Sequence, residues 1–244
     1  MTDEQTIALV TGGNKSIGYE TVAHLAGAGM TVLLGARDKQ RREDAVTALR
    51  AAGHQDVHPI ELDVTDPATA RAAAAEIERG FGRLDVLVNN AGIAGARQPI
   101  AEADPDAVRA VFDVNFTGVL TVTNAMLPLL LRAPSPRIVN VSSGVGSLAQ
   151  MSEPAGVLAD LPASAAYAPS KAALNMLTTQ YAKHLRGTKV LVNAIDPGYC
   201  ATDLNGHSGY LPPSAGAAVI LRLATLEDGG PSGGFFGADG VVPW

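Results

Sequence analysis

The stretch "TGGNKSIG" at residues 11–18 decides how the fold is interpreted. It follows the apolar run IALV and leads into a segment with helical spacing. A glycine-rich turn between a strand and a helix lets the backbone approach a pyrophosphate, and the helix N-terminus supplies N–H donors. Gly12, Gly13 and Gly18 fit this pattern, but Ser16 stands where a middle glycine is usual. A strand-to-helix turn without a ligand would share the pattern, so the rest of the chain has to decide.

Outside this stretch, short apolar runs alternate with longer amphipathic segments. Continuous apolar strands are buried on both faces, and their alternation with helices predicts a parallel sheet covered by helices. We therefore expect one Rossmann-type, doubly wound α/β domain over residues 1–244, with about seven parallel strands. The expected strands are 6–11, 30–36, 57–62, 84–88, 137–142, 188–195 and 234–236. The expected helices are 17–28, 39–52, 67–80, 105–131, 166–186 and 213–226, with long loops at 144–164 and 197–213.

Size and composition agree with an ordered globular chain. Its 244 residues allow one large domain or two small ones, and no shift in composition marks a linker. The sequence is 47% hydrophobic and 17% charged, which excludes the disordered class. The net charge is −6 and no basic stripe is present, so nucleic acid is not an expected partner.

Features of the termini and of cysteine usage predict a cytoplasmic protein. Cys200 is the single cysteine, so no internal disulfide can form, which fits a reducing compartment. The acidic start MTDEQ does not resemble a secretory leader, and no run of about 18 apolar residues predicts a membrane span. The five histidines show no metal-binding spacing, so no metal is expected.

The end of the second strand indicates which dinucleotide is bound. An acidic residue there would bond the ribose 2′-OH and select NAD. That position is Ala36, and Arg37 follows it. A small residue beside a cation makes room for a 2′-phosphate and neutralises it, and Lys15 could add a second cation. These residues favour NADP(H), although both cations could instead be solvated surface charges; we expect Asp38 to point away from the ribose.

A second constellation carries acid–base chemistry. In YAPSK, Tyr167 and Lys171 are four residues apart and share one helix face. A neighbouring ammonium lowers the pKa of a phenol, so the pair can act as a general acid or base near neutrality. Ser142 and Ser143 end the fifth strand, where a hydroxyl can hold a carbonyl oxygen beside the tyrosine. NNAG at 89–92 ends the fourth strand at the same edge of the sheet.

Together these motifs resemble the short-chain dehydrogenase/reductase family, and its carbonyl-reductase-like members in particular. The resemblance covers essentially the full length. Each motif is modest, but seven in the right order are specific. They are TGGNKSIG (11–18), LDV (62–64), NNAG (89–92), VNFTG (114–118), VNVSS (139–143), YAPSK (167–171) and DPGYCATDL (196–204).

The resemblance implies the catalytic roles. Tyr167 would give a proton to the carbonyl oxygen, or remove it in the oxidative direction, and Ser143 rather than Ser142 would hold that oxygen. Tyr167 and Ser143 would thus be the substrate-binding residues. Lys171 would bond the nicotinamide ribose and lower the pKa of the tyrosine. Asn115 would anchor a water that links Lys171 to solvent.

The resemblance also implies the residues that bind the cofactor. Asp63 and Val64 would line the adenine pocket, residues 90–92 would pack against the riboses, and the loop after the sixth strand would cradle the carboxamide. For Cys200 we favour a backbone role over a reactive thiol. The full set is Gly12, Asn14, Lys15, Ser16, Ile17, Gly18, Arg37, Asp63, Val64, Asn90, Ala91, Gly92, Tyr167, Lys171, Pro197, Gly198, Cys200 and Thr202.

The chain departs from the family pattern at two points. One is Ser16. The other is the 24-residue spacing between Ser143 and Tyr167, about twice that of many members. The longer spacing resembles carbonyl-reductase-like members, as do ARD at 36–38 and the tail GGFFGADGVVPW. The resemblance implies that this extra segment lies near the substrate mouth and can cover the helix face through which shorter relatives oligomerise, so a monomer is favoured over a homo-oligomer.

These features lead to one main functional hypothesis. The chain is expected to be an NADPH-dependent oxidoreductase that reduces a ketone or aldehyde to an alcohol, or runs the reverse reaction. The predicted loops carry few charges beyond Glu153, Asp160 and Asp203, so the substrate should be modest in size and largely apolar. The alternative is a non-catalytic NADP(H) sensor of the same fold. A sugar-nucleotide epimerase or dehydratase would need a larger C-terminal region than this chain has.

Overall fold

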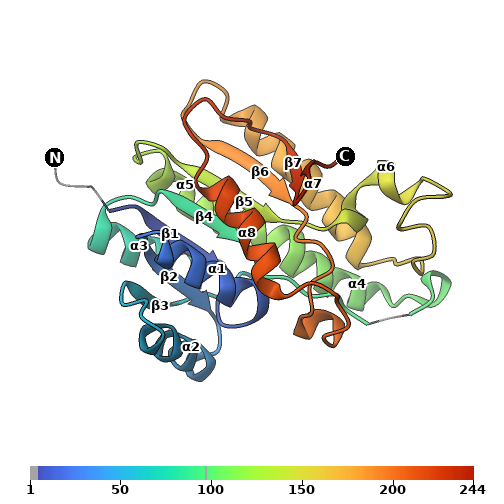
Figure 1. The fold of residues 1–244 in the computed structure, drawn as a ribbon, viewed down its shortest axis with the longest axis horizontal. Helices are drawn as coiled ribbons and strands as arrows, with labels where there is room; N and C mark the ends of the chain where they lie inside the picture. The colour runs from blue at the N-terminus through green and yellow to red at the C-terminus, as the bar shows by residue number, and fades with distance from the viewer. Residues whose placement is uncertain (1–4, 97) are drawn as a thin grey trace.

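A computed structural model describes residues 5–96 and 98–244, and it contains a single twisted sheet (Figure 1). Residues 1–4, which belong to the acidic start considered in the expectation about a secretory leader, lie outside the described residues. The strand order is β3-β2-β1-β4-β5-β6-β7-β8. The strands are β1 (Ile7–Thr11), β2 (Thr31–Ala36), β3 (Val57–Glu61), β4 (Val86–Asn89), β5 (Arg137–Val141), β6 (Leu191–Ile195), β7 (Phe235–Gly237) and β8 (Gly240–Val241).

Helices follow the strands in the expected alternation and cover both faces of the sheet (Figure 1). Short 3-10 turns lie at Ile100–Glu102, Gly144–Gly146 and Asp203–Asn205. The helices are α1 (Ser16–Gly27), α2 (Lys39–Ala51), α3 (Pro67–Phe81), α4 (Pro105–Phe112), a π-helical turn (Asp113–Thr117), α5 (Gly118–Leu130), α6 (Leu148–Met151), α7 (Tyr167–His184) and α8 (Pro213–Ala224).

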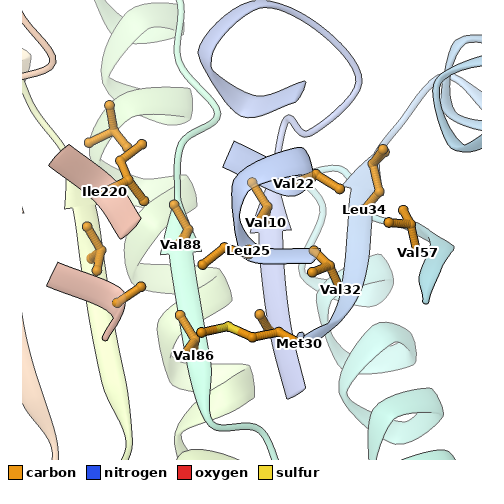
Figure 2. Packing of buried hydrophobic residues seen from close by; sticks show 14 of the residues in the cluster. Val10, Val22, Leu25, Met30, Val32, Leu34, Val57, Val86, Val88 and Ile220 are labelled. Atoms are coloured by element: carbon orange, nitrogen blue, oxygen red, sulfur yellow. The ribbon is translucent and has the colours of Figure 1, made fainter. Parts of the chain in front are cut away.

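Each face of the sheet has its own apolar core, which follows from the two-residue period of a strand. In β1, Ala8 and Val10 point to the face covered by α1, α2 and α8, whereas Ile7 and Leu9 point to the face covered by α3, α5 and α7. Figure 2 shows part of the first core, where Val22 and Leu25 of α1 meet the strands. The prediction of strands buried on both faces is therefore confirmed.

The predicted order of elements is confirmed, with differences in detail. β1 to β7 pair in parallel, as expected, but the two-residue β8 pairs antiparallel with β7 and adds an eighth strand. The sixth strand begins at Leu191 instead of 188, because Thr188 and Val190 form a turn around the Thr188 hydroxyl. The loop expected at 144–164 contains α6, which lies beside the C-terminus, where Ala149 N donates to the carbonyl of Trp244.

The helix expected at 105–131 is interrupted in the middle by the π-helical turn. The same segment is relevant to the prediction that the chain has no membrane-spanning helix. Over Pro105–Leu130 its mean hydropathy is 1.2, so length and composition alone would allow it to cross a membrane. Core helices of soluble proteins pass the same test. Here Val122 and Met126 are buried against the sheet, and so are Asn115 and Thr123. The packing is that of a core helix.

The strand order also sets where a ligand can bind. The chain moves outward from β1 through β2 to β3 and then returns to β4 on the other side of β1. In open parallel sheets, ligands bind at such a reversal, outside the carboxyl ends of the strands. The ends of β1 and β4 carry Gly12 and Asn90, which places two of the predicted motifs at this crevice.

Candidate active site

The phosphate loop is shaped by the glycines that the sequence singles out. Gly12 has a φ of +63°, in the left-handed region that favours glycine. A Cβ at Gly12 would lie 3.0 Å from the Cα of Ala91. A Cβ at Gly18 would lie 2.3 Å from the carbonyl oxygen of Gly12 and 2.5 Å from Nδ2 of Asn90. The turn therefore closes only without side chains at these positions, and this leaves a backbone-lined cradle at the start of α1.

Asn90 and Thr11 tie this loop to the end of β4. The Asn90 side chain donates from Nδ2 to the carbonyls of Thr11 (2.9 Å) and Gly12 (3.1 Å). The Thr11 hydroxyl accepts from the backbone N–H groups of Asn90 and Ala91, both at 3.0 Å. The two motifs predicted to bind one cofactor are thus one hydrogen-bonded unit. Sequence reasoning missed Thr11; its signal is a hydroxyl residue directly before the first glycine.

Ser16 adopts the conformation that a glycine would have. Its φ is +50°, so a residue with a side chain occupies the left-handed region where the middle glycine is usual. The helix that starts here lacks a side-chain cap, whereas Asp38, Asp66 and Asp104 cap α2, α3 and α4. An uncapped N-terminus keeps its N–H groups available to an anion.

The adenosine is expected at the end of the crevice beside β2. There, position 36 is an alanine instead of an acidic residue, and the cation Arg37 follows it. Arg37 is exposed beside Asp63. Burial raises the pKa of Asp63, but hydrogen bonds from Thr65 and the charge of Arg37 outweigh this effect and hold that pKa below its usual value. Asp38 accepts from the N–H of Arg41 (3.0 Å) and so serves as the cap of α2. Val64 is buried against Gly118, where a Cβ would lie 2.9 Å from its Cγ2.

Lys171 places a buried cation at the catalytic end. Its side chain comes from the second turn of α7 and is 4% exposed. Nζ donates to the carbonyl of Val141 (2.8 Å), at the end of β5, and lies 5.7 Å from the ring centroid of Tyr167. Burial lowers the pKa of Lys171 to about 8. The predicted pairing of Tyr167 with Lys171 on one helix face is present in this geometry.

The direction of the tyrosine pKa shift differs from the prediction. Burial raises the pKa of Tyr167 to about 12, and the charge of Asp196 adds to the increase, while a hydrogen bond with Ser143 opposes it. The expected lowering of this pKa is wrong for this structure, because the loss of water around the buried phenol dominates the shift. Sequence reasoning also missed Asp196, which follows β6; its signal is a carboxylate directly before Pro197-Gly198.

The two serines that end β5 have different roles. Ser142 is 1% exposed, and its hydroxyl donates to Oδ1 of Asn175 (2.6 Å). Ser143 is partly exposed and interacts with the Tyr167 side chain. The preference for Ser143 over Ser142 as the residue that faces a reacting group is consistent with this arrangement, because Ser142 is engaged in the interior.

Asn115 is positioned by the π-helical turn that breaks the long helix. π-turns inside α-helices are frequent at functional sites. The Asn115 side chain is fully buried; Oδ1 accepts from the N–H of Ile93, and Nδ2 donates to the Ile93 carbonyl and to Ser170, all near 3 Å. A Cβ at Gly92 would lie 3.3 Å from Asn115 Oδ1 and 3.5 Å from Lys171 Nζ. Asn115 and Lys171 therefore meet across Gly92, the end of the NNAG motif.

The loop after β6 supplies the remaining predicted contacts. Gly198 has a φ of +73°, and its N–H donates to Asp196 (3.1 Å). The Cys200 thiol is buried and contacts the Pro197 carbonyl at 3.2 Å, and burial raises its pKa. The backbone carbonyl of Cys200 accepts from Asn205 (2.8 Å). Cys200 is thus a structural residue of this loop, and the buried Thr202 begins its next turn.

Lys15 has a partner that the sequence does not reveal. Its Nζ lies 2.8 Å from Oδ2 of Asp203, in the turn that follows Thr202. The ion pair connects the phosphate loop with the loop after β6. Lys15, which was expected to add a second cation beside the 2′-phosphate or to be a solvated surface charge, is thus paired with a carboxylate in this structure.

Comparisons with known proteins agree with this site. The sequence profile described as short chain dehydrogenase matches residues 6–209. The chain is 36% identical to (-)-isopiperitenone reductase of Mentha piperita, with 98% of each chain covered. Among solved structures, NADPH-bound carbonyl reductase from chicken fatty liver superposes with a TM-score of 0.87 at 30% identity, covering 99% of this chain and 100% of that one. Salutaridine reductase from Papaver somniferum gives 0.83 at 33% identity, covering 96% and 100%. With Tyr167, Lys171 and Ser143 at the edge where this fold binds its ligands, the chain belongs to the short-chain dehydrogenase family.

Proposed function

We propose that the protein is an NADPH-dependent reductase that converts a ketone or aldehyde to an alcohol. One observation carries this proposal. Tyr167 contacts both Ser143 and the buried Lys171 at the carboxyl edge of the sheet, the same edge that carries the glycine cradle. Relatives named as reductases support the direction of the reaction.

The cradle at α1 fits a dinucleotide. Its wall is backbone at Gly12 and Gly18, where any Cβ would fill the space, and the helix above it is uncapped. Arg37 beside Ala36 fits a 2′-phosphate better than a ribose hydroxyl, because Arg37 supplies positive charge and position 36 has no carboxylate to accept from the hydroxyl. Neighbours in complex with NADP or NADPH support the same choice. When bound, the reduced nicotinamide supplies the hydride.

The protein contributes the proton and its position. With a pKa of about 12, the Tyr167 phenol keeps its proton throughout the neutral range, which is the state needed to protonate a carbonyl oxygen as it becomes an alkoxide. Ser143, beside the phenol, can donate a hydrogen bond to the same oxygen. Lys171 is charged below its pKa of about 8 and lies where it stabilises negative charge on the phenol after the proton leaves. Asn115 holds the chain at residues 92–93 against Lys171.

The substrate is proposed to be of modest size and largely apolar. The loop after β6 exposes Tyr199, Leu204 and Tyr210, and the rings of Tyr199 and Tyr210 meet edge to face at 6.0 Å. Asp203, one of the few charges predicted for the substrate loops, is engaged with Lys15. The long segment between Ser143 and Tyr167 exposes Leu148 and Val157. These side chains favour contact with a hydrophobic skeleton around the carbonyl.

Tyr167→Phe tests the catalytic assignment. We expect NADPH binding to remain and carbonyl reduction to fall by at least about 100-fold, because only the proton donor is removed. Tyr181→Phe is the matched control. It lies on the same helix, and its pKa is also raised to about 12, but its hydroxyl contacts Asn124 (2.8 Å), away from the site. Absence of wild-type turnover across ketones, aldehydes and quinones, with NADPH binding intact, would favour the sensor alternative.

Arg37→Asp tests the cofactor assignment. We expect the Michaelis constant for NADPH to rise far more than that for NADH, because the new carboxylate repels a 2′-phosphate. Arg79→Asp, an exposed residue near the end of α3, is the control and should affect both alike. Equal effects of Arg37→Asp on the two cofactors would contradict the assignment.

Two further parts of the proposal concern the state of the protein in the cell. We propose a cytoplasmic location, which the unpaired, buried Cys200 supports. We also propose a monomer, on the ground of the long segment between Ser143 and Tyr167. Light scattering coupled to gel filtration at micromolar concentration tests the second point. A mass near 25.0 kDa is expected, and a mass of twice that value would overturn it.

A further inference from the structure

The phosphate loop and the loop after β6 are held together by contacts that the proposed transfer of a proton and a hydride does not use. Lys15 Nζ lies 2.8 Å from Oδ2 of Asp203. In addition, the N–H of Asp203 points at the Ser16 hydroxyl, with 3.4 Å between nitrogen and oxygen. The residues are 187 positions apart in the sequence, so this contact closes the site across its two halves.

Asp203 is presented to Lys15 by a turn with its own internal bonds. Its second carboxylate oxygen lies 3.0 Å from Nε2 of His207. Asn205 accepts from the N–H of Thr202 (3.1 Å) and donates to the Cys200 carbonyl. Ser16 and His207 are the two non-glycine residues with positive φ in the described part of the chain, and both lie at this contact. The sequence has placed two strained residues on the two sides of one ion pair.

The charges involved are accessible and easily exchanged. The side chains of Lys15 and Asp203 are 53% and 45% exposed. An exposed ion pair contributes only about 0.2–1 kcal/mol, whereas an ammonium paired with a phosphate forms a stronger, charge-assisted bond. Lys15 is also the residue that precedes the uncapped N-terminus of α1, where phosphate is favoured. One cation thus stands between a carboxylate of the protein and the place where a ligand phosphate would lie.

We propose that Asp203 competes with the cofactor for Lys15. In this proposal, which rests on the proposed function, Lys15 leaves Asp203 and pairs with a phosphate of the dinucleotide when the cofactor binds. Asp203 remains with His207. The Asp203 carboxylate therefore weakens cofactor binding by the free energy needed to break the Lys15–Asp203 ion pair. The same pair couples the phosphate loop to the turn at Asp203–Asn205.

The test is a double-mutant cycle on binding, read by NADPH fluorescence or by calorimetry and not by activity. The proteins are the wild type, Asp203→Asn, Lys15→Met and the double variant. We expect Asp203→Asn to tighten NADPH binding about two- to fivefold, the range that an exposed ion pair allows. In the Lys15→Met background the same change should have no effect. Asp203→Ser, checked by thermal unfolding with the others, guards against a local misfolding of the asparagine variant.

Glu78→Gln is the matched control. It breaks the Arg132–Glu78 pair, which has the same 2.8 Å separation and similar exposure (50% and 53%) but lies on α3, away from the crevice. It should leave NADPH affinity unchanged. Unchanged affinity in both Asp203 variants, or equal tightening with and without Lys15, would overturn the proposal. If the wild type does not bind NADPH at all, the proposed function itself fails.

Two further probes identify the phosphate, and either result supports the exchange. If NADH gains as much affinity as NADPH from Asp203→Asn, Lys15 pairs with the pyrophosphate. If NADPH and adenosine 2′,5′-bisphosphate gain and NADH does not, Lys15 pairs with the 2′-phosphate.

Discussion

The two ends of the crevice are built on opposite physical principles. The phosphate end depends on the absence of side chains: Gly12 and Gly18 let backbone meet backbone, and a single carbon at Gly18 would lie 2.3 Å from an oxygen. The catalytic end depends on side chains removed from water, with Lys171 4% exposed and its pKa lowered to about 8. One end is fixed by shape, and the other by the electrostatics of burial.

This difference determines how each end responds to substitution. At the phosphate end, a change should act through steric strain and should depend little on pH. At the catalytic end, a change should act through the energy of burying a charge, which pH can switch off. The contrast would fail if the effect of a substitution in the phosphate loop on stability depended on pH. It would also fail if the effect of replacing the catalytic lysine did not.

Lys171→Met should give the largest effect. The folded protein disfavours the charged lysine, whose pKa falls from 10.5 to about 8. Below pH 8 the lysine is charged in both the folded and unfolded states, so the wild type bears the full burial penalty. As pH rises from 8 to 10.5 the folded state loses its proton first, and the penalty disappears. We expect the variant to be about 1–3 kcal/mol more stable at pH 7, after the loss of the bond to Val141.

Urea unfolding of both proteins between pH 6 and pH 10.5 provides the measurement. The two free energies of unfolding should converge as pH rises through the window from 8 to 10.5. Lys183→Met, an exposed lysine on the same helix, is the control and should show no such convergence. A constant difference between wild type and Lys171→Met over this range would contradict the view that burial of charge governs the catalytic end.

Gly18→Ala should give the next largest effect, at the phosphate end. The added methyl group meets the Gly12 carbonyl at 2.3 Å and Asn90 Nδ2 at 2.5 Å; the first is backbone, and the second is held by its hydrogen bonds to the Thr11 and Gly12 carbonyls. We expect a loss of about 1–3 kcal/mol in the free energy of unfolding, independent of pH, together with a loss of NADPH binding. Gly27→Ala in the same helix is the control, since its Cβ would meet only His54, at 3.7 Å. It should be neutral or slightly stabilising.

The fold could be predicted from the sequence because it depends on local patterns. Strand runs such as 30–36 and helices such as 39–52 carry their period within a few residues, and their order fixes a parallel sheet. β8 was missed because two residues carry no period. The π-turn was missed because Asn115 and its neighbours continue a helical pattern, and only the buried bonds of its side chain show the break.

The site could be predicted in its residue types but not in its energetics. Motif spacing brought Asn90, Ser143, Tyr167 and Lys171 to one edge of the sheet. It could not show that loss of water around the Tyr167 phenol would raise its pKa, because solvent exposure depends on packing from distant segments. The Lys15–Asp203 pair was missed for the same reason, since nothing local to TGGNKSIG indicates a partner far along the chain.

Ser16→Gly should give the smallest effect, and it addresses the one irregular residue of the phosphate end. A residue with a side chain at φ +50° bears a strain of about 1 kcal/mol, which glycine removes. Glycine has more conformational freedom in the unfolded chain, which offsets part of this gain in stability. The long 3.4 Å contact between the Ser16 hydroxyl and Asp203 is also lost. We expect Ser16→Gly to be more stable than the wild type by about 0.5 kcal/mol, whereas Ser16→Ala keeps the strain and gains nothing.

Urea unfolding measures the difference in stability between the two variants, and their NADPH affinities show whether the Ser16 hydroxyl binds phosphate. If both lose affinity equally, the hydroxyl binds phosphate; if only the alanine variant does, the backbone conformation alone matters. An alanine variant as stable as the glycine variant would show that the left-handed turn is not strained, and that shape does not govern this end of the crevice.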